Sequence, residues 1–130
     1  MSGKLNKFKD RSVEFIETMD VAEGVECDVY KFVNDDSCDL GIIRIKPGCE
    51  TPRQIVLMGD ETIEGFFTGK GKLSIIFADG REKEFDTLNG LEVKVGIGDK
   101  MQWIAAGNSE LVAYEICKPP YEPGRFKNLN

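Results

Sequence analysis

The chain has 130 residues, of which 41% are hydrophobic and 31% charged, and its formal net charge is −6. This composition predicts one folded domain over residues 1–130 and is too apolar for a disordered chain. The negative charge provides no field to attract a phosphate backbone or an anionic lipid surface, so we expect neither nucleic acid nor a membrane as partner.

The sequence contains no histidine. This removes the commonest general base near pH 7 and the commonest metal ligand, and it excludes His-dependent catalytic triads and His-bearing zinc sites. Catalysis would have to use a carboxylate, Lys, Tyr or Cys. The cysteines at positions 27, 38, 49 and 117 show no zinc-type spacing, and the N-terminal stretch is polar and rich in lysine. We therefore expect free thiols and a cytoplasmic protein.

The first half of the chain carries strand signals separated by turns. Residues 12–19 have an apolar spacing that suits either a short helix or an alternating strand. Residues 27–33 alternate, residues 34–37 are polar, and residues 40–45 are rich in β-branched side chains. These patterns predict two strands joined by a turn.

The second half continues in the same way. Residues 73–77 and 81–85 flank Asp79-Gly80, which predicts a hairpin with a type I′ turn. Further strands are expected over residues 91–95, 100–105 and 111–117. The total is about nine or ten short strands, which predicts an all-β sandwich, jelly roll or small barrel.

Three segments resemble a known family. Residues 45–56, followed by 61–73, resemble the first conserved motif of the cupin superfamily, and residues 95–103 resemble the second. The double-proline segment 115–126 is similar to the tail of small single-domain cupins. The resemblance covers residues 40–126. It implies a double-stranded β-helix of two antiparallel sheets with a pocket between them, and a homodimer.

The resemblance fails at the metal ligands. The family's two clustered histidines fall on Gln54 and Val56, its glutamate on Glu61 or Thr62, and its third histidine on Met101 or Gln102. Neutral amide, valine and thioether groups make a poor site for a first-row divalent metal. We therefore expect no metal and no cofactor.

Strand alternation limits which acidic side chain reaches the pocket. Thr62 and Glu64 point to one side of their strand, while Glu61 and Ile63 point to the other. If the family spacing to Gly69 holds, Glu64 lies inside. A carboxylate in an apolar pocket would have a raised pKa, and it could act as an acid or bind a ligand hydroxyl or amine. On the opposite face it would be an ordinary solvated glutamate.

Five more residues are candidates for the pocket wall: Gln54, Met101, Trp103, Tyr114 and Arg44. Met101 and the sole tryptophan, Trp103, would line a stacking site or pack in the core. Gln54 would read a ligand or tie a loop. Arg44 would anchor an anion or pair with an acid on the outside. Only one of Tyr114 and Glu115 can face inward, since they are consecutive in a strand.

Two functions follow from these candidates. The first is a metal-free protein that binds or senses a small molecule in the barrel pocket. The alternative is a metal-independent isomerase or lyase acting on a sugar or small acid, with Glu64 or Glu61 as base and Tyr114 as proton donor.

Overall fold

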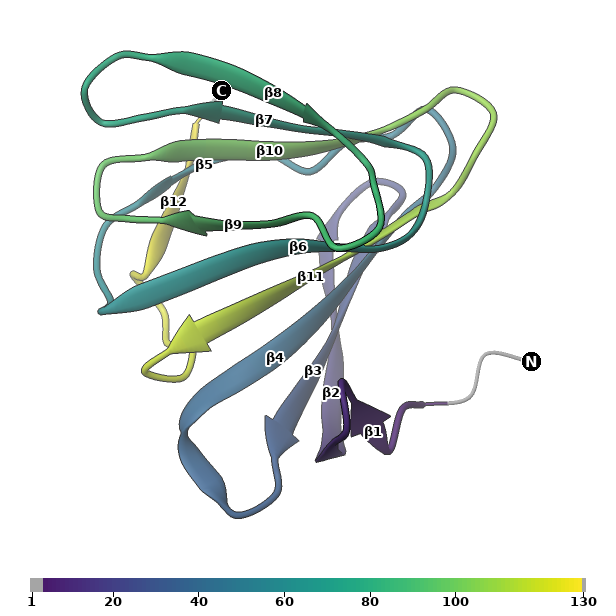
Figure 1. Ribbon diagram of the computed structural model, residues 1–130, viewed down its shortest axis with the longest axis vertical. Helices are drawn as coiled ribbons and strands as arrows, with labels where there is room; N and C mark the ends of the chain where they lie inside the picture. The colour runs from purple at the N-terminus through teal and green to yellow at the C-terminus, as the bar shows by residue number, and fades with distance from the viewer. Residues whose placement is uncertain (1–3, 130) are drawn as a thin grey trace.

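Residues 4–129 are described by a computed structural model (Figure 1), and the regular elements in this range are all β-strands. They form two sheets in which every neighbouring pair is antiparallel. The larger sheet has seven strands, in the order β1 (Lys7–Phe8), β2 (Arg11–Ala22), β3 (Val25–Phe32), β4 (Asp35–Ile45), β11 (Leu111–Lys118), β6 (Glu61–Gly69) and β9 (Glu92–Val95). The smaller has five, in the order β12 (Phe126–Leu129), β5 (Arg53–Val56), β10 (Lys100–Ala105), β7 (Gly71–Ile76) and β8 (Glu82–Asp86). The jelly-roll prediction is confirmed.

The structure decides between helix and strand for one segment, and it confirms a predicted hairpin but not its turn type. The segment left open between helix and strand, residues 12–19, lies within β2. The hairpin between β7 and β8 is confirmed, because the two strands pair in antiparallel register. Its type I′ turn is wrong: Gly80 has a φ of 93°, but Asp79 is not among the residues with positive φ. The chain closes instead through a longer loop in which Phe77 N–H donates to the carbonyl of Arg81 at 2.8 Å.

The core between the sheets is built by side chains from both of them. Leu73 and Ile75 on β7, Trp103 on β10 and Ile45 on β4 are almost fully buried there. Alternation along β4 and β11 places every second side chain on this side, which we call the inner face of the seven-stranded sheet.

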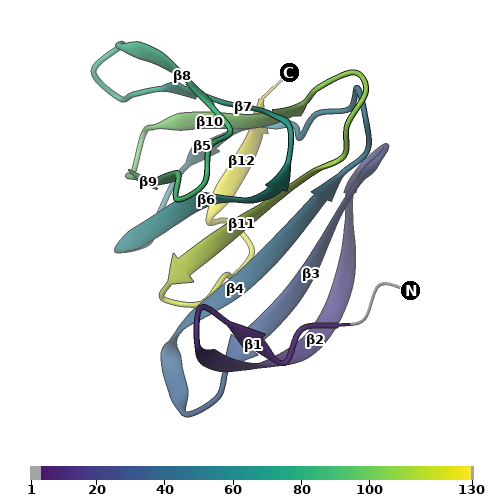
Figure 2. The same ribbon diagram turned by 45° about the vertical axis from the view of Figure 1, so that its right-hand side comes forward.

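A second apolar cluster covers the opposite side of the same sheet, which we call the outer face. Tyr30, Phe32, Leu40 and Tyr114 lie in it, and Phe8 of β1 packs edge-on against Tyr114 with ring centroids 4.9 Å apart. Figure 2 shows β1 beside the start of β2, with which it pairs, and Leu5 and Phe8 of this N-terminal segment pack on the outer face. The large sheet is therefore packed on both of its sides. No helix within residues 4–129 is long and apolar enough to cross a membrane.

Candidate functional site

A cavity of about 390 Å³ opens between the inner face of the large sheet and the β5–β12 edge of the small one. Strands β2, β3, β4 and β11 supply one wall, and β5, β12 and the loop before β12 supply the other. Apolar side chains make up much of the lining: Met19, Val21, Val29, Ile43 and Phe126. The polar lining residues are Asp20, Cys27, Asp39, Thr51, Gln54, Glu115, Cys117, Tyr121 and Asn128.

Two carboxyl groups meet at the inner wall. Glu64 on β6 and Glu115 on β11 are paired across the strands, so their side chains share the inner face. Glu64 is 1% exposed, and its Oε1 accepts a hydrogen bond from the Trp103 indole N–H at 2.8 Å. Glu115 lines the cavity itself. We call Glu64 and Glu115 the carboxyl pair.

The pKa of Glu64 is well above its usual range. Burial is the main cause, and the charge of Glu115 and a hydrogen bond with its carboxyl add to it, while the Trp103 indole acts to lower it. Among residues 4–129, no donor reaches Oε2 of Glu64. A proton retained on Glu64 resolves this, because Glu64 then donates to Glu115 while still accepting from Trp103. Glu64 thus keeps its proton to a higher pH than an ordinary glutamic acid.

Two thiols lie beside the carboxyl pair. Burial raises the pKa of both Cys27 and Cys117 far above the usual thiol value, and the charge of Glu115 raises them further. Cys117 Sγ donates to Oε1 of Glu115 at 3.5 Å. Both side chains are therefore neutral thiols at pH 7, which makes them wall groups rather than nucleophiles.

Asp39 on β4 is the next acid along this wall. It is paired with Cys117 across the strands, two residues from the Gly41 that faces Glu115. Burial raises the pKa of Asp39, and the Tyr121 backbone N–H, which donates to Oδ2 at 2.9 Å, acts against the increase. Asp39 and Glu115 are thus diagonal neighbours on one face of the sheet.

Three of the predicted pocket residues lie inside, at different depths. Gln54 lines the cavity, where its Nε2 donates to Asn128 Oδ1 at 2.8 Å. Trp103 and Met101 are buried in the core rather than exposed to the cavity. Trp103 affects the cavity only indirectly. Its indole N–H donates to Glu64, which is paired with the cavity residue Glu115. Glu61 points away and pairs with Lys94 at 3.1 Å.

The inward placement of Tyr114 is wrong. Tyr114 lies on the outer face, where its hydroxyl donates to Glu92 and accepts from Lys9 Nζ at 2.8 Å. The reason is the register of β11: Tyr114 pairs with Gly65, while Glu115 pairs with Glu64. Glu115 is therefore the inward residue of the two.

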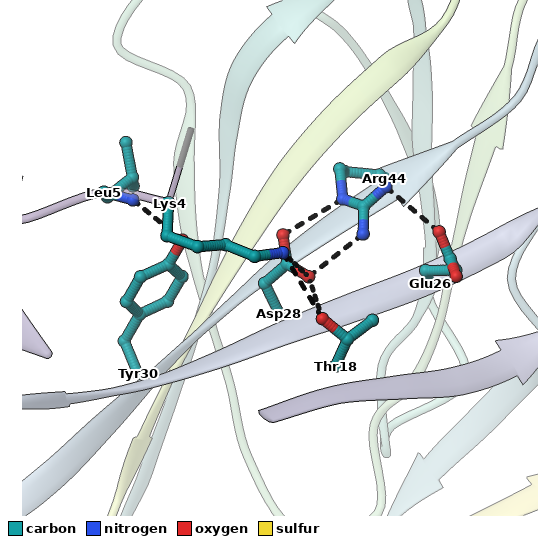
Figure 3. Close-up of polar contacts among 7 residues, drawn as sticks. All are labelled: Lys4, Leu5, Thr18, Glu26, Asp28, Tyr30 and Arg44. Carbon is teal, nitrogen blue, oxygen red and sulfur yellow. Dashed lines mark hydrogen bonds and ion pairs between the residues drawn. The ribbon is translucent and has the colours of Figure 1, made fainter. Parts of the chain in front are cut away.

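Arg44 also lies on the outer face, so its role as an anion anchor in the pocket is wrong. Its guanidinium makes two bonds to Asp28, at 3.1 and 3.0 Å, and one to Glu26 at 3.0 Å (Figure 3). Asp28 also accepts from Thr18 Oγ1 at 2.7 Å and from Lys4 at 3.3 Å. Burial acts to raise the pKa of Asp28, but these donors outweigh it and the pKa is lowered. This is a structural ion pair.

The residues that the sequence interpretation missed come from two places. Asp39 and Cys117 needed the β4–β11 register, which no local pattern reveals. Tyr121, Phe126 and Asn128 reach the cavity because β12 pairs with β5. One available signal was the placement of Glu115 two residues from Ala113 and Cys117, small side chains that leave room for a cavity.

The fold has known counterparts among solved structures. Oxalate decarboxylase of Lactobacillus farciminis, in a formate complex, superposes with a TM-score of 0.70 at 17% identity, over 90% of this chain and 33% of that one. The Bacillus subtilis oxalate decarboxylase, described with Mn(II) centres, gives 0.69 at 17% identity over 83% and 29%. The Momordica charantia 7S globulin gives 0.67 at 15% identity over 87% and 34%.

These are cupin-fold proteins, and the chain described here has the cupin fold. At such identities the likeness establishes the fold alone, and the chain spans about a third of the length of each of these proteins. No family model and no curated protein matches the sequence.

The residues at the cupin ligand positions do not fit a metal ion. Val56 has no donor atom and is buried in the core together with Met101. The Thr62 hydroxyl accepts from the buried Arg125 guanidinium at 2.9 Å, which places a positive charge there. Within the described range, no three Cys, Asp or Glu side chains converge so as to hold a metal. The residues at these positions therefore give no ground for assigning the manganese of the Bacillus subtilis enzyme to this chain.

Proposed function

We propose that this chain binds a small organic molecule in the cavity between its sheets and does so without a metal ion. The observation that carries the proposal is the cavity itself. Its volume of about 390 Å³ lies in the range of small-molecule sites, and its wall combines apolar side chains with a few convergent polar groups. Strands supply most of the wall, so the polar groups are held on rigid elements.

A thermal-shift screen of small polar and amphipathic compounds tests this proposal, with two matched variants. Val29→Phe places a ring in the cavity, whereas Val33→Phe makes the same change at an exposed position outside it. We expect compounds that raise the Tm of the parent and of Val33→Phe, by mass action on the folded state, but not that of Val29→Phe. Equal shifts in both variants would place binding outside the cavity, and the absence of any stabilising compound would remove the proposal.

The metal-free part has its own measurement. Protein purified without an affinity tag should carry far less than one equivalent of Mn, Fe, Ni, Cu or Zn by elemental analysis, because the donor set at the cupin positions is incomplete. One tightly held metal per chain would contradict it.

One observation favours catalysis as a second candidate. Glu64, whose pKa is raised, is paired with Glu115 beside the cavity, and two such carboxyl groups can take and return a proton at a bound molecule. In this version Glu115 replaces Tyr114, which lies on the other face. The isomerase or lyase alternative then predicts exchange of a carbon-bound proton for deuterium in a stabilising compound, measured by NMR in D₂O. Exchange should stop in Glu115→Gln; exchange that persists there would exclude the pair.

A further inference from the structure

We infer that the molecule bound in this cavity is an organic cation: a protonated amine attached to an apolar or aromatic body. The inference rests on the proposed binding function and names the class of ligand. It follows from the charges around the cavity, from what already neutralises them, and from the shape of the remaining surface.

The acidic side chains that face the cavity are Asp39 and Glu115, and its lining within residues 4–129 includes no Lys or Arg. Asp20 pairs with Glu26 across β2 and β3, so its carboxylate lies on the outer face with Arg44. The ion pairs within the same range involve other acids, such as Asp28, Asp35 and Glu92. Asp39 and Glu115 take part in none of the ion pairs formed within residues 4–129. A wall of this kind opposes an anionic ligand and attracts a cation.

The nearest buried cation does not cancel this charge. Arg125 acts to lower the pKa of Asp39, which favours the carboxylate form, yet its guanidinium is not part of the lining. Its two terminal nitrogens donate to four oxygens at 2.6–3.3 Å, the carbonyls of Pro119, Glu61 and Lys118 and the Thr62 hydroxyl, while Nε has no partner among the described residues. Arg125 therefore supports the frame behind the cavity and leaves Asp39 available to a ligand.

Glu64, which is paired with Glu115 and is not itself part of the lining, gives a second indication. It is nine-tenths or more buried, and its Oε2 has no protein donor in the described residues. An ammonium group beside Glu115 would satisfy the carboxyl pair with hydrogen bonds of the charge-assisted kind.

The rest of the surface suits an apolar body. Phe126 and Tyr121, which both line the cavity, stack with ring centroids 6.1 Å apart and planes at 24°, and the Tyr121 backbone is bonded to Asp39. Val29 and Ile43 extend the apolar surface on the large sheet. Aromatic faces beside carboxylates are the surroundings in which proteins hold organic ammonium ions.

Three probes of nearly equal size separate charge from shape: benzylamine, benzyl alcohol and benzoate. Their Kd values would be measured by NMR chemical-shift titration at pH 7 and low salt. We expect benzylamine to bind about tenfold or more tightly than benzyl alcohol, as one charge-assisted bond to a partly buried carboxylate provides. Benzoate should bind more weakly than the alcohol, and added salt should weaken only the amine.

Charge-removing variants locate the ammonium group. Asp39→Asn and Glu115→Gln keep the side-chain shape and an acceptor oxygen, so the fold should remain intact, and each should weaken benzylamine by about tenfold while leaving benzyl alcohol unchanged. Asp36→Asn, on the same strand but outside the cavity lining, is the matched control and should change neither.

The outcomes separate the two levels of the proposal. If benzyl alcohol binds as tightly as benzylamine, or if Asp39→Asn and Glu115→Gln bind benzylamine like the parent, the cation inference is wrong while binding in the cavity stands. If no probe binds, the cation inference is also wrong, and the compound screen with Val29→Phe then decides the proposed function separately.

Discussion

On the outer face of the seven-stranded sheet, the buried Asp28 carboxylate is bonded by Arg44, Lys4 and Thr18, whereas on the inner face the buried Glu64 carboxyl has only the Trp103 indole and a shared proton. The pKa of Asp28 is lowered and that of Glu64 is raised. A charge matched by fixed opposite charges has a structural role. The Glu64 carboxyl has no fixed opposite charge, so acceptor atoms of the carboxyl pair remain available to a ligand. This pair lies on the inner face, which is the side of the sheet that has the cavity.

The largest effect should come from a glycine on the outer face. A Cβ on Gly65 would lie 2.0 Å from Cζ of Tyr114, whose ring is buried over this position. Gly65→Ala should therefore destabilise the protein by about 3 kcal/mol in urea unfolding, because the ring cannot move without breaking its packing. Gly107→Ala is the matched control, because Gly107 has nothing within 4 Å and, like Gly65, no positive φ. Equal losses in the two variants would show that the ring contact is unimportant.

Arg44→Leu should have the next largest effect. It leaves Asp28 buried without its two guanidinium bonds, which we expect to cost about 2 kcal/mol of the free energy of unfolding. Arg81→Leu, at an exposed arginine paired with Asp79, should change it by less than about 0.5 kcal/mol. Binding of benzylamine should be unchanged in Arg44→Leu, and a loss of binding would mean that the two faces are not independent.

Glu64→Gln tests the inner face through pH. The folded-state pKa of Glu64 is raised above its usual 4.5, so its stabilising contribution is fully present below that value and is lost as pH rises towards the folded pKa. The amide introduced in this variant mimics the protonated side chain, accepting from Trp103 and donating to Glu115. Urea unfolding at pH 5 and pH 8 should therefore show a larger alkaline loss in the parent than in Glu64→Gln. Parallel pH profiles would mean that Glu64 ionises freely in the fold.

Much of the fold could be predicted because strand alternation and turn residues are local. The Asp79-Gly80 hairpin and the strands around residues 100–105 and 111–117 are where the sequence places them. Strands β1, β5 and β12 are too short for an alternation of apolar and polar residues to be visible in the sequence. Their positions depend on pairing with other strands.

The site could be predicted only in part, for the same reason. Alternation shows that Tyr114 and Glu115 point to opposite sides, but only the pairing of Glu115 with Glu64 decides which points inward. The family spacing from Glu64 to Gly69 predicted that Glu64 faces inward, which is the face it occupies. Gly69 is the last residue of β6 and has a φ of 97°. The tail residues Phe126 and Asn128 are separated from the cavity wall in sequence and reach it only through the β5–β12 pairing.

The smallest effect on stability should come from a glycine on the inner face, in contrast to Gly65. A Cβ on Gly41 would meet Cys27 Sγ at 2.9 Å, and the carbonyl of Glu115 lies no closer than 4.0 Å. The thiol can rotate into the cavity, and Gly41 has no positive φ to be strained, so Gly41→Ala should change the free energy of unfolding by less than about 1 kcal/mol.

The thiol displaced in Gly41→Ala would instead occupy ligand space next to Glu115. Benzylamine binding should therefore weaken by about threefold to tenfold in Gly41→Ala and recover in Cys27→Ala/Gly41→Ala, where no sulfur is displaced. Calorimetric titration of the two variants distinguishes this from a change in charge, because the carboxyl pair and Asp39 are intact in both. Binding that is lost in the double variant as well would mean that the Gly41 backbone itself contacts the ligand.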